Sequence, residues 1–421
     1  MTCRFYFLWR KIVTFRSWFC YISVISWGWK VSEEKMAFLK YVSPCHFGLE
    51  SVLAGELKRM DADNVVAHNG KVTFSGGPEI LARANICLRT AERVLIELAS
   101  FRATSFEDLF QGVSKIPLED FVGSKDAFPV KGWALNSKLM SVPDCQSIVK
   151  KAAVERLKKH YGIEWFPETG PVHQLQFSIL NDEVSIMLDT SGAGLHKRGY
   201  RVNSNDAPIK ETLAAGIIDL ARVRSDTHFY DPFCGSGTLV IEAATKALNI
   251  PPCLKRKFAA QNFGFIDEAV WREERERGIE GIRHDASFFA YGSDIDPEAV
   301  ELTKANAKKA GVFSKVLITQ KDVRDFALKT PGGVICCNPP YGERMLEIEE
   351  ANNLYRIMGK VFGKLETAAE YIISPAENFE SLFGRKAIKR RKLYNGMLKC
   401  QLYMYFEPSN RPARIRPPAA K

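Results

Sequence analysis

The predicted strand at residues 334–337 leads directly into Asn338, Pro339, Pro340 and Tyr341. The Asn338 side-chain oxygen and the Pro339 carbonyl can each accept an N–H hydrogen. The prolines fix φ, so both acceptors are in place before a ligand arrives. An amine conjugated to a ring is a poor nucleophile because its lone pair is delocalised. Two fixed acceptors would draw such an amine towards tetrahedral geometry and free the lone pair. These residues are therefore candidates for chemistry on an amino nitrogen.

Acidic side chains follow three earlier predicted strands. Asp231 ends the strand before FCGSGT, Asp294 and Asp296 follow the strand at 288–292, and Asp322 follows the strand at 315–319. Ligands of open α/β sheets bind at the carboxyl ends of the strands, and a carboxylate after the second strand commonly holds a ribose diol. Asp231 can accept hydrogen bonds from a cationic or hydroxyl-bearing ligand. The sequence thus predicts a ligand site along one edge of a doubly wound sheet.

A glycine-rich turn lies between the strand ending at Tyr230 and a helix starting near Thr238. Gly235 and Gly237 let the backbone pass close to a ligand and supply positive φ angles. The turn has no GKS or GKT and only G-S-G in place of GxGxxG, so it is not predicted to cradle phosphate.

DPFCGSGT, GSDIDP and NPPY, in this order, resemble the class I S-adenosylmethionine (SAM)-dependent methyltransferases that act on nitrogen. The resemblance implies that Asn338 to Tyr341 hold the target, with Tyr341 stacked on the base. It also implies that Asp294 binds the cofactor ribose and Asp322 the adenine amine. The residues expected to contact SAM are Asp231, Phe233, Gly235, Gly237, Asp294, Asp322 and Asn338.

Residues 36–406, with HKRGYR, APIKETLAA, DPFCGSGTLVIEAA and NPPYGERM, resemble bacterial THUMP-containing methyltransferases that modify guanine N2 in 23S ribosomal RNA. The implied fold is α/β: a Rossmann-like seven-stranded methyltransferase domain preceded by a ferredoxin-like unit and a THUMP RNA-binding unit, both α+β. Related enzymes act on transfer RNA, so that substrate remains an alternative. A target base inside a helix would have to be unpaired or flipped out.

Three other functions compete with this one. DNA adenine or protein glutamine methylation could use the same NPPY site, although a THUMP-like region argues against both. Pyrimidine carbon-5 methylation would need a cysteine nucleophile. Cys336 and Cys337 are near but precede NPP on a buried strand. An inactive RNA-binding assembly factor would not need the intact Asp231, Gly235, Asp294 and Asn338.

The predicted elements divide the chain into five segments. The order β-α-β-β-α-β, with a hairpin at Asn69-Gly70, predicts a ferredoxin-like unit. A charged helix at 267–277 belongs to an insertion, residues 248–287, expected near the substrate side. The segments are an N-terminal extension at 1–35, the ferredoxin-like domain at 36–102, the THUMP domain at 103–190, the methyltransferase domain at 191–406 and a basic disordered tail at 407–421.

Two groups of basic residues are candidate RNA contacts. One lies on the long helix that Pro143 opens, and the other lies in the linker before the methyltransferase domain. Lys389 to Lys392 on an edge strand could touch RNA or deter edge pairing. The first two groups comprise Lys150, Lys151 and Lys158, and His196, Lys197, Arg198 and Arg201.

Composition agrees with a polyanionic partner, because the 421-residue chain has a net charge of +10. Its ten cysteines form no CxxC pair and no zinc-like cluster with histidine, which predicts reduced thiols, a cytoplasmic location and no required metal. The apolar run at 17–29 is too short to span a bilayer, so no membrane is expected. Met36 is the expected start of the working protein.

Overall fold

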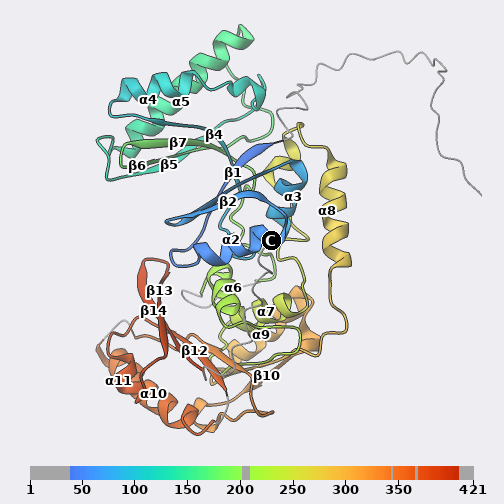
Figure 1. Ribbon diagram of the computed structural model, residues 1–421, viewed down its shortest axis with the longest axis vertical. Coiled ribbons are helices and arrows are strands. Elements are labelled where there is room, and N and C mark those ends of the chain that lie inside the picture. Colours follow the sequence, from blue (N-terminus) through green and yellow to red (C-terminus); the bar gives the residue numbers. More distant parts are fainter. Residues whose placement is uncertain (1–37, 202–208, 343–344, 366–367, 407–421) are drawn as a thin grey trace, which may run out of the picture.

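The computed structural model describes residues 38–201, 209–342, 345–365 and 368–406. Three parts follow one another along the long axis of the molecule, with the first two above and the C-terminal domain below (Figure 1). The expectations for residues 1–35 and 407–421, and for Met36, lie outside the described residues.

The first part has the predicted β-α-β-β-α-β order. Its elements are β1 (Leu39–Pro44), α2 (Glu50–Arg59), β2 (Asp63–His68), β3 (Lys71–Gly76), α3 (Pro78–Cys87) and β4 (Leu95–Arg102). β2 and β3 pair antiparallel around Gly70, which has a φ of 72°, so the predicted hairpin is confirmed. Leu53 and Leu57 of α2 and Leu81 of α3 are fully buried beneath the helices.

The second part adds three strands and two main helices to the same sheet. They are α4 (Phe106–Ser114), β5 (Val130–Leu135), α5 (Val142–Tyr161), β6 (Leu175–Leu180) and β7 (Glu183–Asp189). β4 pairs antiparallel with β7 from Leu95–Asp189 to Arg102–Glu183, so both parts share one sheet in the order β2-β3-β1-β4-β7-β6-β5. The sequence pattern does not reveal this continuity, because no local feature specifies pairing between strands so far apart.

The C-terminal domain is a second seven-stranded sheet, in the order β10-β9-β8-β11-β12-β14-β13. Its first strands are parallel and the β14 pairings are antiparallel. The strands are β8 (His228–Asp231), β9 (Phe289–Asp294), β10 (Val316–Gln320), β11 (Val334–Cys337), β12 (Ala369–Ser374), β13 (Lys389–Asn395) and β14 (Leu398–Tyr405). The expected fold class is confirmed.

Helices cover both faces of this second sheet. One apolar core joins the sheet to α6 (Glu211–Leu220), α7 (Thr238–Ala247) and α9 (Pro297–Ala310). A separate core on the other face joins it to α10 (Met345–Phe362) and α11 (Phe379–Phe383). This three-layer arrangement buries the parallel strands and leaves their carboxyl ends at one edge.

The insertion at 248–287, expected near the substrate side, lies away from the ligand edge of the sheet. It follows α7 and precedes β9, and in a parallel sheet that connection lies at the amino ends of the strands, opposite the ligand edge. Its helix α8 (Glu268–Glu280) runs alongside α3 (Figure 1). Buried Trp271 and Phe258 belong to the core that contains Leu81 and Ile86. The insertion therefore fastens the C-terminal domain to the N-terminal sheet.

Candidate ligand site at the carboxyl edge

The four polar residues predicted at strand ends follow adjacent strands. β10, β9, β8 and β11 are neighbours, and they are followed or ended by Asp322, Asp294, Asp231 and Asn338 in that order. The chain runs from β8 to β9 on one side and places β11 on the other, so the strand order reverses beside β8. Such a reversal opens a crevice at the carboxyl edge. Asp231 and Asn338 lie on its two sides.

The two glycines of the turn differ in their surroundings. Gly235 has a φ of 52°, and a Cβ placed there would have open space within 4 Å. Gly237 has a φ of 83°, and a Cβ there would approach Thr303 Cγ2 to 2.7 Å. Gly235 thus presents bare backbone to the crevice, whereas Gly237 permits close packing of α7 against α9.

The glycine turn is held by side chains that the sequence analysis did not identify. Thr303 Oγ1 donates to Gly235 O at 2.6 Å, and Asn306 Nδ2 donates to Ser236 O at 2.9 Å. Both residues are fully buried on α9. A Thr and an Asn three residues apart on the inner side of an amphipathic helix are the pattern that could have indicated this role.

Asp294 joins the end of β9 to the glycine turn. Its Oδ2 accepts the Gly235 N–H at 2.9 Å and its Oδ1 accepts the Asp296 N–H at 3.1 Å. Each carboxylate oxygen retains acceptor capacity for a ligand hydroxyl.

Asp231 is the buried carboxyl group of the crevice, with 1% of its surface exposed. It accepts the Phe233 N–H at 3.1 Å, and no cation pairs with it in the described part of the chain. Burial, with a smaller contribution from the nearby Asp294 charge, raises the pKa of Asp231 to about 8. A cationic ligand would relieve this cost. The site therefore suits a ligand that carries both a positive group and hydroxyls.

Asn338 is oriented by its own loop. The Tyr341 hydroxyl donates to Asn338 Oδ1, and the Tyr355 hydroxyl of α10 donates to Pro340 O at 3.3 Å. An amide oxygen has two lone pairs, so one remains for an incoming N–H. Burial raises the pKa of Tyr341 well above its usual range, which keeps the phenol a donor.

Asp322 already has a partner. Its carboxylate accepts the Arg324 N–H at 2.8 Å and pairs with the exposed Arg324 guanidinium at 2.6 Å. Phe233 is half-buried beside the core of the α10 face. Asp322 follows β10, two strands from β8 in the sheet, and would have to share its oxygens with any ligand amine.

The cysteines do not form a nucleophilic site. Eight are free in the described residues, and burial raises the pKa of both Cys336 and Cys337 well above the ordinary value. A thiol that resists ionisation is a poor nucleophile. The described residues also contain no His, Cys, Asp and Glu group that could hold a metal ion, and none of their helices has the length and apolarity to cross a membrane.

The basic linker cluster is largely turned inward, which corrects the prediction for Arg198. Its side chain is 1% exposed, donates to Leu195 O at 2.7 Å and to Arg89 O, and lies 3.6 Å from Glu242 Oε1. Arg201 donates to Thr238 Oγ1 at 2.9 Å and pairs with Glu211 at 3.2 Å. Arg198 joins the linker to α7 and to the loop after α3 and is not open to RNA. Arg201, whose side chain is 19% exposed, joins the linker to α6 and α7.

The other predicted basic residues are accessible to different degrees. His196 contacts Glu92 at 3.5 Å, and Lys197 is exposed. Lys151 is exposed on α5. Lys150 pairs with Glu168 at 2.7 Å, and Lys158 pairs with Glu164 at 3.1 Å. Lys151 and Lys197 are thus the most available cations of the predicted set.

Glu92 forms polar contacts with residues from three parts of the chain. Its sequence pattern did not indicate this role. It accepts from Thr212 Oγ1 and lies 3.2 Å from His46 and 3.6 Å from Lys210. Hydrogen bonds from His196, His46 and Thr212 hold the pKa of Glu92 well below its usual range, against the opposing effect of burial. Glu92 fixes the start of α6 against the N-terminal sheet.

We expect Arg198→Met to lower the free energy of unfolding by about 3–5 kcal/mol, because it leaves the Glu242 carboxylate buried without its cation. Chemical denaturation of the full chain measures this. The double variant Arg198→Met/Glu242→Gln is the control and should recover most of the loss. An unchanged unfolding free energy in the single variant would contradict the buried role of Arg198.

Three family models match consecutive segments of the chain. They are the RlmL ferredoxin-like domain at residues 40–95, the THUMP domain at 103–189 and the RMKL-like methyltransferase domain at 198–404. Together they cover most of both sheets described above.

Known relatives match over most of the chain. "Putative RNA methyltransferase YpsC" of Bacillus subtilis is 41% identical over 382 residues, which cover 90% of this chain and 97% of that protein. Ribosomal RNA large subunit methyltransferase K/L of Psychromonas ingrahamii is 33% identical over 401 residues, 91% of this chain but only 52% of the relative. The crystal structure of SMU.472 complexed with SAH superimposes with a TM-score of 0.82 at 39% identity, covering 88% of this chain and 98% of that one.

Proposed function

Because this chain belongs to the RMKL-like family of SAM-dependent RNA methyltransferases, we propose that it methylates the exocyclic N2 of a guanine and that this guanine lies in 23S ribosomal RNA. SAM supplies an electrophilic methyl group, and the chain supplies binding, orientation and hydrogen-bond acceptors. With ribosomal RNA as its substrate, the protein would act in the cytoplasm.

The observation that carries this proposal is the adjacency of β8 and β11. Their pairing at Phe229–Val334 and Tyr230–Ile335 brings the end of the Asp231 strand beside the end of the Asn338 strand. Asp231, Asp294 and bare Gly235 fit a ligand with a cationic end and a ribose, as SAM has. Asn338 Oδ1 and Pro339 O then fit an amino group on the other side of the crevice.

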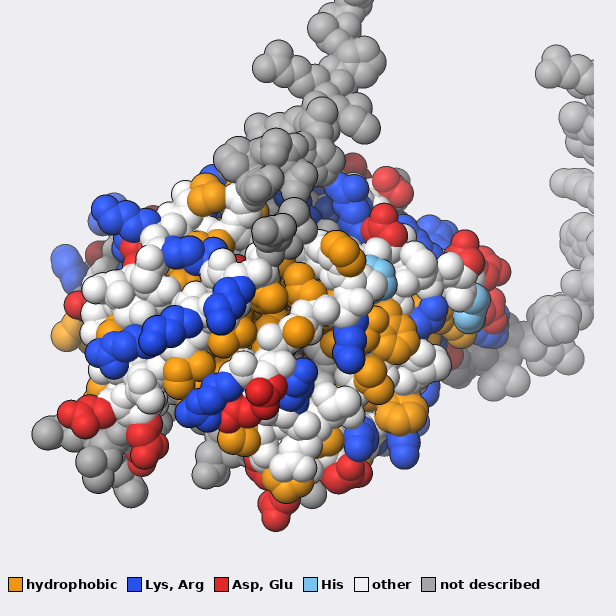
Figure 2. Space-filling view, turned by 90° about the horizontal axis from the view of Figure 1, so that it is seen from below, with side chains coloured by type: hydrophobic (Ala, Val, Ile, Leu, Met, Phe, Trp, Pro, Cys, Tyr) orange, Lys and Arg blue, Asp and Glu red, His pale blue; other side chains and the backbone are white. Residues whose placement is uncertain are grey.

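Several features support RNA as the carrier of that amino group. Residues 103–189 match the THUMP model, and the net charge of the chain is +10. Lys and Arg side chains form a row along the left of the lower face of the C-terminal domain, next to an apolar centre (Figure 2). A nucleotide drawn out of the RNA needs cationic surface for its phosphates and apolar surface for its base.

The test is product analysis. The full-length protein is incubated with methyl-labelled SAM and, separately, with undermethylated 23S ribosomal RNA, transfer RNA or DNA, and each product is digested to nucleosides. We expect the label in N2-methylguanosine from the ribosomal RNA. Label in transfer RNA alone would support the alternative substrate, and label in DNA alone would refute the RNA proposal.

A further inference from the structure

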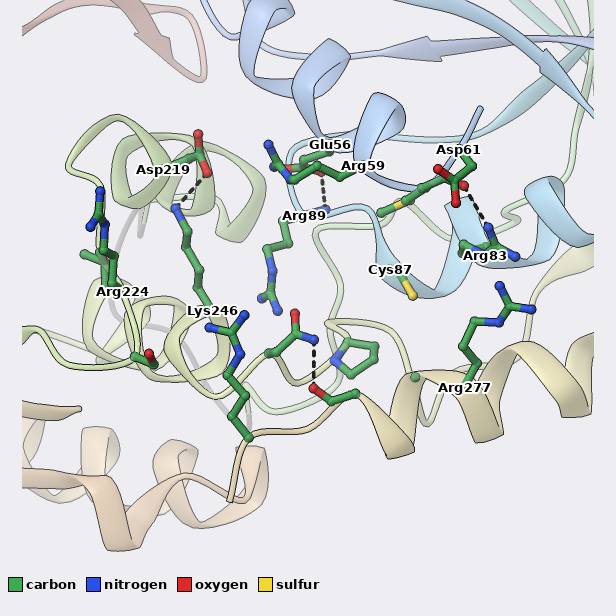
Figure 3. Close-up of a pocket in the computed structure, with 18 of the residues that line it drawn as sticks. Glu56, Arg59, Asp61, Arg83, Cys87, Arg89, Asp219, Arg224, Lys246 and Arg277 are labelled. Carbon is green, nitrogen blue, oxygen red and sulfur yellow. Dashed lines mark hydrogen bonds and ion pairs between the residues drawn. The ribbon is translucent and has the colours of Figure 1, made fainter. Parts of the chain in front are cut away.

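A cleft of about 960 Å³ lies between the ferredoxin-like unit, the loop between α6 and β8, and α8 (Figure 3). Its walls carry eight Lys or Arg side chains and five Asp or Glu side chains. The cleft is separate from the SAM crevice. Arg222 and Arg224 precede β8, whereas Asp231 ends β8 at the opposite edge of the sheet. A ligand in the cleft would therefore not reach the reacting atoms.

Most of the carboxylates in the cleft are already engaged. Glu274 forms two hydrogen bonds with Arg83, at 2.7 and 2.8 Å. Asp219 pairs with Lys246 at 2.7 Å. Glu56 is buried and accepts the Arg89 N–H at 2.8 Å. Only Asp61 and Asp226 remain to offset the other cations.

Four arginines of the cleft are exposed, and their guanidinium groups form no hydrogen bond or ion pair with a described residue. They come from α2, from the loop between α6 and β8, and from the loop after α8. They are Arg59, Arg222, Arg224 and Arg283. Their four positive charges exceed the two negative charges of Asp61 and Asp226, so the cleft carries a net positive charge that attracts anions.

We propose that this cleft binds the sugar–phosphate backbone of the RNA substrate away from the target nucleotide. Arginine presents a planar fork of donors that matches phosphate oxygens. Figure 3 shows Arg224, Arg59 and Arg277 spread across the cleft and not converging on one point. That spacing suits successive phosphates of a polymer better than one small anion. The proposal rests on the RNA substrate of the proposed function.

The test is RNA binding by the full chain carrying Arg222→Gln/Arg224→Gln. Affinity for unmethylated 23S ribosomal RNA is measured by filter binding from about 50 to 200 mM salt. We expect about tenfold weaker binding and a slope of log K against log salt that is shallower by about 1.5, since each lost phosphate contact contributes about 0.7–0.9. At saturating RNA, kcat and the KM for SAM should stay unchanged.

Lys308→Gln/Lys309→Gln is the matched control, because these two exposed lysines lie on α9 of the same domain. It should leave the affinity and the salt slope unchanged. The double variant Arg59→Gln/Arg283→Gln changes two arginines on the other walls of the cleft. It should weaken RNA binding and reduce the salt slope as Arg222→Gln/Arg224→Gln does. Melting temperatures of all variants should match the parent protein, since every substituted side chain is exposed.

Two results would overturn the proposal. One is an unaltered RNA affinity and salt slope in both cleft variants. The other is calorimetric binding of pyrophosphate or ATP that the cleft variants abolish while RNA binding is unaffected, which would make the cleft a small-anion site. Binding is measured without methyl transfer, so it does not depend on which nucleoside becomes methylated. Failure of the N2-guanine assignment would appear only in the product analysis.

Discussion

Asn338→Ala should lower kcat for methyl transfer to RNA by about 10²- to 10³-fold, because it removes an acceptor fixed where charge develops on the amine. Its KM for SAM should change far less. The Asn338 amide is held by Tyr341, outside the Gly235 turn that would carry the cofactor. Single-turnover transfer of labelled methyl, with RNA and SAM both saturating, separates the chemical step from binding.

Tyr341→Phe is the matched variant for this site. It keeps the ring but removes the hydroxyl that donates to Asn338 Oδ1. We expect a loss of about tenfold, since the amide keeps its acceptor oxygen but loses the bond that orients it. If Asn338→Ala retained the parental rate, or if Tyr341→Phe lost more activity than Asn338→Ala, the amine-acceptor role of Asn338 would be wrong.

The ligand edge could be predicted from sequence because its residues occur in short, local patterns. A buried strand followed directly by Asp231, Asp294 or Asn338 specifies both the element and the edge where the side chain lies. Gly235 and Gly237 marked the turn equally well. The patterns could not show that, of these two glycines, only Gly235 faces open space. The space beside Gly237 is filled by Thr303, which lies 66 residues after Gly237 in the chain.

The contacts between domains could not be predicted in the same way. Arg198 lies in a basic, glycine-containing linker and has the local pattern of an exposed phosphate contact. Its burial depends on Glu242, Arg89 and Leu195, which come from three separate segments. The β4–β7 pairing and the position of α8 against α3 are also tertiary choices. Charge pattern alone cannot distinguish a cation that holds domains together from one that meets a ligand.

Asp231→Asn should weaken SAM binding about 10- to 100-fold, because a neutral amide cannot form the charge-assisted bond that the carboxylate offers a cation. The same change should stabilise the ligand-free protein. Asn keeps an oxygen for the Phe233 N–H and has no charge to bury. Calorimetric SAM titration and thermal unfolding of the ligand-free chain measure the two effects. Asp285→Asn, an exposed carboxyl away from the crevice, should alter neither.

The ionisation of Asp231 should also make the stability of the ligand-free protein depend on pH. The pKa of Asp231 is about 8 in the folded protein and about 4 in the unfolded chain. The folded state thus holds a proton that the unfolded state releases. Stability must fall as pH rises between these values, by on the order of a few kcal/mol, with no such penalty below about pH 4.

A bound cation reverses this effect, because it favours the ionised carboxylate. The affinity of the parent protein for SAM should therefore increase from pH 6 to pH 8.5, while the affinity of Asp231→Asn should stay nearly flat over the same range. Parallel pH profiles in the two proteins would show that Asp231 does not meet the positive end of the cofactor. If the SAM affinities of the two proteins changed with pH in the same way, cofactor binding would not explain why the Asp231 carboxyl is buried.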